Sequence, residues 1–435
     1  MAQMEHQNPI TRVLLAISIV LLAAKLAGAL AVRLRQPAVL GELLIGVVLG
    51  NAVLQGFTRF EFLRPPSPEA DRQAVVIQKP ELAAVTLDTL ARIGVIILLF
   101  EVGLECKVSE LRRVGGSALL VAVFGVSASL GLGWLASSWL LPRQAWQTHL
   151  FIGAAICATS VGITARVLKD LGRIHTPESK IILGAAVIDD VLGLVVLTVI
   201  EALVLHGSAN FGDIAWITGK AAGFLIGAVW LGRWLTPQIL RIAGLLRVHG
   251  MLVVTLFVFC FALAWLAGLA GLDPIIGAFA AGLILDEKEY KAAVPSGERA
   301  IEDMVFPWSA MLVPIFFVMM GFQVNVQDFL NPSVLALAGG ITLAAVLGKQ
   351  ACRLGVVEQG AQRRIVGFGM IPRGEVSLIF ATVGRGLMIG GRPVVDSASY
   401  GAILGMVIIT TLATPPLLSW SLKFRRDNAE RRTPE

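Results

Sequence analysis

Two adjacent aspartates, Asp189 and Asp190, lie in the middle of an apolar stretch. Residues 181–188 precede them and residues 191–200 follow them without another charge. If this stretch crosses a bilayer, burying one carboxylate near the centre costs on the order of 3 kcal/mol, and such a cost is rarely kept without a use. A carboxylate can bind either a proton or a cation. The two acids therefore predict a site at which protons and a metal cation compete.

Helix geometry gives the two acids different roles. Consecutive helical residues point about 100° apart, so one aspartate can line a pathway while the other faces a neighbouring helix. Lys349 is the best candidate for that neighbour, because it follows the apolar residues 344–348 in another predicted span. A lysine paired with one aspartate would keep that aspartate ionised until the pair is broken. Alternatively, its aliphatic stem reaches the cytoplasmic interface.

Two predicted spans contain sequence that is poor helix material. In the span at 147–168, the segment Cys157–Thr164 places three hydroxyl residues and a glycine at mid-span. In the span at 365–386, the segment Gly367–Glu375 contains three glycines, a proline and two charges. Backbone can leave the helix at membrane depth only where protein or a water-filled cavity satisfies it. If both segments unwind and cross, their free carbonyls and helix ends lie beside the aspartates.

Other charges also lie within or at the edge of the apolar segments. Arg373 and Glu375 either compensate the dipoles of the broken helices or form only a local salt bridge. Lys25, Arg92 and Lys220 can extend their heads to the membrane interface.

The composition places most of the chain in lipid. Of 435 residues, 56% are hydrophobic and only 15% are charged, which excludes a soluble enzyme, a disordered chain and a disulfide scaffold. Apolar runs give about thirteen candidate spans. The net charge of +6 is expected from cytoplasmic loops, so nucleic acid is not predicted as a partner. The four cysteines are scattered singly, so neither a zinc site nor a disulfide framework is expected.

The loops predict the orientation of the chain. Lys and Arg residues are concentrated in the loops after odd-numbered spans and in the C-terminal tail. This asymmetry favours an odd number of crossings, with the N-terminus outside and the C-terminus in the cytoplasm. The first apolar run has no small-residue cleavage site after it, so we expect a retained span rather than a signal peptide.

The two halves of the chain contain a weak internal repeat. Residues 40–46 resemble 276–282, with two glycines at the same spacing, and residues 100–111 resemble 318–329. Each pair joins spans that are seven apart, and an odd displacement places the second copy upside down in the membrane. Inverted repeats are typical of secondary transporters. The alternative is chance similarity in apolar sequence of low complexity.

These features together resemble a known family. The matching segments are residues 158–163, 188–193, 314–321 and 369–375, with Lys349 in span 11. They are similar to the monovalent cation/proton antiporters, particularly the electrogenic bacterial sodium/proton antiporters. The resemblance covers essentially the whole chain. It implies an all-α polytopic membrane protein of about thirteen transmembrane helices, with two inverted-topology repeats and crossing broken helices.

The resemblance also implies how the chain divides into domains and by which mechanism it transports. A scaffold and dimerisation domain is expected at 1–112 and 248–331, and an ion-translocating core at 113–205 and 332–421. A linking helix is expected at 206–247 and a cytoplasmic tail at 422–435. The core is expected to move like an elevator within a homodimer, in the inner membrane of a prokaryotic cell.

Functional residues are carried over from the resemblance by position. Asp190 is expected to be the main carboxylate for the cation and the proton, with Asp189 as the partner of Lys349 and as a second group at the transported sodium. Thr159 and Ser160 are expected to be polar groups at the first broken segment. No enzymatic activity and no cofactor are expected; the partners are protons, a monovalent cation and the lipid bilayer.

Several alternatives remain open from the sequence. Sodium is the expected cation, with lithium and potassium as alternatives. The potassium-efflux members of the superfamily carry a cytoplasmic nucleotide-binding domain, which is not expected here, and usually have Gln where this chain has Asp189. A channel or a non-transporting membrane sensor could use the same scaffold. An intramembrane aspartyl protease is disfavoured, because its two acids must converge from two helices, whereas Asp189 and Asp190 are neighbours on one helix.

Overall fold

The computed structural model describes residues 9–54, 82–104, 108–206, 211–245, 250–285, 301–322, 332–389 and 391–430. Within these ranges the chain is helical apart from one short hairpin and the connecting turns. Among the described residues, eight helices are long and apolar enough to cross a membrane, and shorter apolar helices accompany them. The prediction of an all-α polytopic membrane protein is confirmed.

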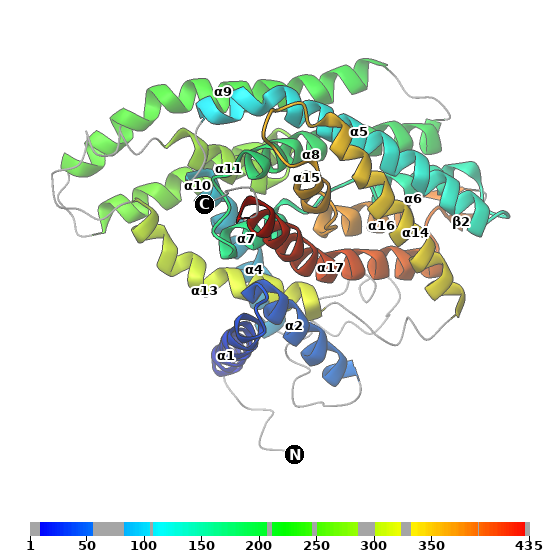
Figure 1. Ribbon diagram of the computed structural model, residues 1–435, viewed down its shortest axis with the longest axis horizontal. Coiled ribbons are helices and arrows are strands. Elements are labelled where there is room, and N and C mark those ends of the chain that lie inside the picture. Colours follow the sequence, from blue (N-terminus) through cyan, green and yellow to red (C-terminus); the bar gives the residue numbers. More distant parts are fainter. Residues whose placement is uncertain are drawn as a thin grey trace. The chain divides into compact units, whose positions relative to one another are not determined.

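The helices follow the predicted spans in order (Figure 1). The uninterrupted ones are α1 (Pro9–Arg33), α2 (Ala38–Leu54), α4 (Leu82–Leu104), α5 (Val108–Leu140), α8 (Pro177–His206), α9 (Phe211–Leu245), α10 (Met251–Leu269), α11 (Pro274–Ile284), α13 (Ile301–Phe322), α14 (Pro332–Gln350) and α17 (Ser397–Glu430). The 3-10 helix η3 (Ala351–Gly355) extends α14. Two spans are broken, into α6 (Trp146–Ala155) and α7 (Val161–Asp170), and into α15 (Arg363–Gly369) and α16 (Glu375–Gly386).

A small β-hairpin between α16 and α17 was not predicted. Strands β1 (Met388–Ile389) and β2 (Arg392–Pro393) pair antiparallel. Gly391 has a φ of +79°, a conformation that glycine adopts without the steric cost of a side chain. The hairpin returns the chain from the end of α16 to the start of α17.

The chain forms two compact units. One comprises Met1–Val95 and Trp308–Pro332, and the other comprises Ile96–Pro307 and Ser333–Glu435. The expected division into a scaffold at 1–112 and 248–331 and a core at 113–205 and 332–421 follows different borders and remains a prediction. All predicted site residues fall in the second unit.

Close helix contacts reproduce the internal repeat. In the first unit, Gly46 of α2 leaves room for the backbone of α13 at Val318, and Gly321 of α13 leaves room for α2 at Leu43. In the second unit, Gly282 of α11 leaves room for α4 in the same way. The reciprocal position in α4 is Gly103, which faces Phe279 of α11. Because the repeat relates α2 to α11 and α4 to α13, the same glycine-mediated crossing occurs twice, each time between one helix of each copy.

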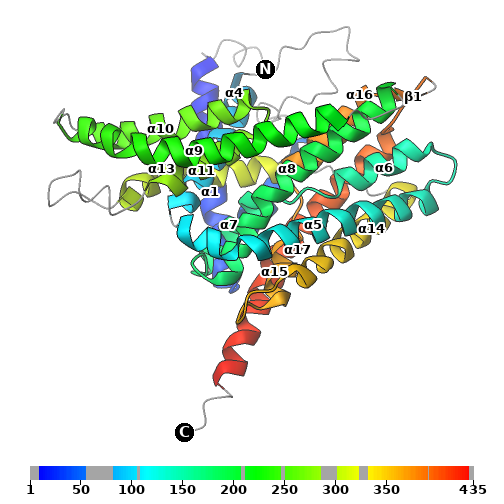
Figure 2. The same cartoon turned by 90° about the horizontal axis from the view of Figure 1, so that it is seen from above.

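Small residues also set the crossing between α5 and α14. A side chain at Gly348 would begin 2.6 Å from the Ser129 Cα atom, and one at Gly355 would begin 2.4–2.7 Å from the α5 backbone around Val121. The two helices can therefore approach closely, and they run alongside each other in Figure 2. This approach places Lys349, the residue after Gly348, deep within the second unit.

Candidate ion-binding site at two helix breaks

The two broken spans meet at their breaks. The non-helical segments Ile156–Ser160 and Met370–Gly374 are equal in length. The Ser160 amide donates a hydrogen bond to the Pro372 carbonyl over 2.8 Å. Backbone groups freed by one break are thus partly satisfied by the other, as an interruption at membrane depth requires.

Threonines of the first broken span satisfy carbonyls at the second break. The Thr164 hydroxyl donates to the Gly369 carbonyl over 2.7 Å. The Thr159 hydroxyl lies 3.5 Å from the Met370 carbonyl. Both carbonyls belong to the end of α15, where no following helical turn supplies an amide. Thr159 therefore has a partner in the protein, in contrast to the neighbouring Ser160, whose hydroxyl has none among the described residues.

Arg373 is fully buried and binds backbone oxygens. Its Nη1 atom donates to the Thr159 hydroxyl and to the Met370 carbonyl, both over 3.3 Å, and its Nη2 atom donates to the Ala345 carbonyl over 3.2 Å. Threonines of α17 hold the same residue: Thr411 donates to the Arg373 carbonyl over 2.7 Å. The guanidinium thus lies at the C-terminal end of α15, where a positive charge offsets the helix dipole.

Glu375, the other charge predicted at this break, is the first residue of α16. Its side chain lies outside the described part of the structure, so the choice between dipole compensation and a local salt bridge with Arg373 stays open for Glu375.

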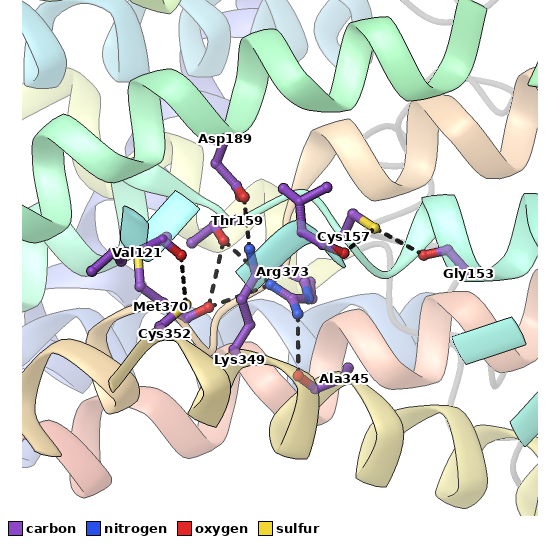
Figure 3. A network of polar contacts seen from close by, with 11 residues as sticks. Val121, Gly153, Cys157, Thr159, Asp189, Ala345, Lys349, Cys352, Met370 and Arg373 are labelled. Carbon is purple, nitrogen blue, oxygen red and sulfur yellow. Dashed lines mark hydrogen bonds and ion pairs between the residues drawn. The ribbon is translucent and has the colours of Figure 1, made fainter. Parts of the chain in front are cut away.

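An ion pair lies next to the breaks (Figure 3). Lys349 Nζ of α14 is 2.8 Å from Asp189 Oδ1 of α8, and both side chains are fully buried. The lysine stem therefore does not reach an aqueous interface. The second carboxylate oxygen, Asp189 Oδ2, has no hydrogen-bond partner among the described residues. The ammonium compensates the charge of Asp189 but leaves one oxygen able to accept a further partner.

Asp190 differs from its neighbour in accessibility. Its exposed fraction is 7%, whereas that of Asp189 is zero. The two side chains leave α8 in different directions because consecutive residues are about 100° apart. Asp189 thus faces Lys349, and Asp190 is the less completely buried of the two.

This arrangement can bind a hard cation through oxygen atoms. Two carboxylates and the Ser160 hydroxyl are oxygen donors, which suit hard cations better than nitrogen or sulfur donors do. Within the described ranges no cluster of three His, Cys, Asp or Glu residues could hold a resident metal ion.

Sequence reasoning missed two features near the site. Gly125 of α5 faces Lys349: a side chain there would begin 3.3 Å from both the Cδ and the Nζ atoms of the lysine. Lys169 of α7 forms an ion pair with the buried Glu101 of α4 over 2.7 Å. Nothing in the sequence indicates that these two residues are partners.

Comparison with known proteins decides the family. The family described as "Sodium/hydrogen exchanger, transmembrane" matches residues 18–423. The chain belongs to this exchanger family. The predicted resemblance to the monovalent cation/proton antiporters is thereby confirmed, and so is the expectation of a transporter rather than an enzyme.

Two similar members of the exchanger family are curated bacterial antiporters. The chain is 36% identical to the "High-affinity Na(+)/H(+) antiporter NhaS3" of Synechocystis, over 93% of this chain and 89% of that protein. It is 35% identical to the "Na(+)/H(+)-K(+) antiporter GerN" of Bacillus cereus, over 93% of this chain and 95% of that protein.

A solved structure has the same fold. The sodium proton antiporter MjNhaP1 from Methanocaldococcus jannaschii at pH 8 aligns with a TM-score of 0.62, over 95% of this chain and 97% of that one. Its sequence identity is 16%, so the likeness concerns the fold alone.

Proposed function

We propose that this exchanger moves sodium, with lithium as an accepted substitute, against protons. The observation that carries the proposal is the fully buried ion pair of Lys349 and Asp189, 2.8 Å apart, with Asp190 next in the same helix. A buried carboxylate with a separable partner is a group at which a proton and a cation can replace each other. The Synechocystis relative is named as a Na(+)/H(+) antiporter, which supports sodium.

In the proposed cycle, Asp190 carries either a proton or the cation. When Asp190 is ionised, it attracts the cation, and the hydroxyls of Thr159 and Ser160 supply neutral oxygens beside it. The cation also competes with Lys349 for Asp189, so its arrival weakens the ion pair. From the resemblance to the electrogenic sodium/proton antiporters, we infer that the exchange is electrogenic.

The finer points of transport rest on the resemblance to the antiporters. We infer that the core at 113–205 and 332–421 moves as an elevator against the scaffold, and that two copies form a homodimer in the inner membrane. We also infer an external N-terminus and a cytoplasmic C-terminus from the distribution of Lys and Arg in the loops. In this proposal no cofactor takes part, because the ions are the substrates.

Potassium is the second candidate cation. The Bacillus cereus relative is named as an antiporter of potassium as well as sodium, and its similarity extends over the same share of this chain, 93%. Comparing sodium, lithium and potassium in one assay decides between the two candidates.

Everted membrane vesicles with a pH-sensitive dye test the proposal. Respiration makes the vesicles acidic inside, and sodium is then added. We expect sodium to collapse the gradient in wild type, and Asp190→Asn to abolish the response. The matched control is Glu201→Gln, the same loss of a carboxylate in the same helix, which should respond like wild type. Wild-type exchange by Asp190→Asn would contradict the role of Asp190.

A further inference from the structure

Ser377 of α16 is a buried hydroxyl without a partner. Hydroxyls inside helices of this chain usually donate to a carbonyl one turn earlier: Thr382 donates to Leu378 over 2.9 Å, and Thr414 donates to Thr410 over 2.7 Å. Ser377 is fully buried, yet its Oγ atom has no hydrogen-bond partner within the described part of the chain. Leaving a polar group buried in this way costs about 1–3 kcal/mol.

The helix break explains why Ser377 does not follow the usual pattern. Its carbonyl one turn earlier belongs to Arg373, and that oxygen already accepts the Thr411 hydroxyl over 2.7 Å. The next residue, Gly374, has φ −148° and ψ −144°, so its carbonyl does not point along the axis of α16 as a helical one does. The hydroxyl of Ser377 is therefore available to a ligand.

Several buried hydroxyls lack a hydrogen-bond partner, and two of them lie at the helix breaks. Within the described ranges the buried hydroxyls without a partner are those of Ser129, Ser160, Thr236, Thr342, Ser377 and Ser399. Only Ser160 and Ser377 directly border a break: Ser160 is the last residue before α7, and Ser377 lies in the first turn of α16. Each of the two broken spans thus contributes one free hydroxyl.

Contacts along α8 place Ser377 at the level of Asp190. Ile182 of α8 packs over Gly369, and Gly193 of α8 packs against the Phe380 ring, whose Cζ atom lies 3.6 Å from where a Gly193 side chain would begin. The two contacts follow each other in the same order along both spans, so α8 and the broken span of α15 and α16 run in the same direction. Phe380 is three residues after Ser377, and Gly193 is three residues after Asp190. Because residues three apart share a helix face, Ser377 and Asp190 lie on facing sides.

We propose that the Ser377 hydroxyl is a further ligand of the transported cation, opposite Asp190 and together with Ser160. The inference rests on the proposed function, since it assigns a ligand to the same site. A cation stripped of water needs several oxygens, and neutral hydroxyls supply them without adding charge to a buried site. Because Ser160 belongs to the first broken span and Ser377 to the second, a cation bound by both hydroxyls would contact both spans at once.

The test compares cation affinity in proteoliposomes that carry purified protein. The half-saturating concentrations of sodium, lithium and potassium are measured by dissipation of a pH gradient. We expect Ser377→Ala to raise the value for sodium about tenfold while the maximal rate stays within about twofold, because one of several ligands is lost. Ser377→Thr keeps the hydroxyl oxygen and should stay within about threefold of wild type.

A second substitution and a control separate this result from a packing defect. Ser377→Cys has nearly the volume of serine, so it keeps the packing while replacing oxygen with sulfur, a poor ligand for a hard cation; it should also raise the sodium value. Ser399→Ala removes another buried, partnerless hydroxyl at the start of α17 and should leave affinity unchanged.

Two outcomes overturn different claims. If Ser377→Ala and Ser377→Cys keep wild-type affinities for all three cations while Asp190→Asn is inactive, the assignment of Ser377 is wrong and the proposed function stands. If wild-type protein itself exchanges none of the three cations for protons, the proposed function is wrong.

Discussion

Breaking the ion pair between Lys349 and Asp189 should destabilise the protein far more than removing both charges. The Nζ and Oδ1 atoms are 2.8 Å apart and both side chains are fully buried. At an effective dielectric constant of about 20, the attraction over this distance is about 6 kcal/mol. Desolvation of the two ions offsets most of that gain, so the ion pair adds little to the free energy of unfolding compared with a pair of apolar side chains. A single substitution, by contrast, leaves one buried charge uncompensated and costs about 3–5 kcal/mol.

A double-mutant cycle measures this difference. We expect Lys349→Met and Asp189→Asn each to lower the free energy of unfolding by about 3–5 kcal/mol, and the double variant to lose less than either single variant. The coupling free energy should therefore be about 3 kcal/mol or more. Lys25→Met, the same substitution at an exposed lysine of α1, should change stability by less than about 0.5 kcal/mol.

Unfolding of the purified protein in mixed micelles, followed by fluorescence of its nine tryptophans, provides the free energies. If the double variant is as unstable as the sum of the two single variants, the coupling is absent. The reasoning from the buried pair would then be refuted.

Two further substitutions test how the site is held. Gly125→Ala should lower the maximal rate of exchange about tenfold, because its methyl group would begin 2.6 Å from Cys352 Sγ and 3.3 Å from Lys349 Nζ, so the side chains beside the ion pair must shift. Gly131→Ala, in open space on the same helix, is the control; equal maximal rates for both variants would contradict the expectation. Arg373→Lys should lower the maximal rate about tenfold, because one ammonium group cannot serve the carbonyls on both sides that the guanidinium reaches; a wild-type rate would show that these bonds do not support the site.

The sequence predicted those parts of the site that are costly to bury. Adjacent acids in an apolar run require compensation, and Lys349 was the cation in a second span that could supply it. The structure brings Lys349 and Asp189 together. Glycine, proline and hydroxyl residues at mid-span likewise predicted the two breaks, because such residues weaken a helix whatever its neighbours are.

Features that depend on contacts between distant segments were not predictable in this way. Ser377 looks like any helical serine until Thr411, from α17, is seen to occupy the carbonyl that it would otherwise use. Gly125 is one of 45 glycines, and only the approach of α14 shows that it makes room for Lys349. The ion pair of Lys169 and Glu101 joins α7 to α4, and nothing in the sequence indicates that these helices are neighbours.

Proton release on cation binding tests most directly whether protons and a cation replace each other at these acids. Sodium chloride is added to purified protein in weakly buffered solution, with choline chloride at equal ionic strength as the reference, and the pH is recorded. We predict that sodium releases protons from wild-type protein and none from Asp190→Asn. Stabilisation of the wild-type protein by sodium without any release of protons, or equal release from Asp190→Asn, would contradict the account.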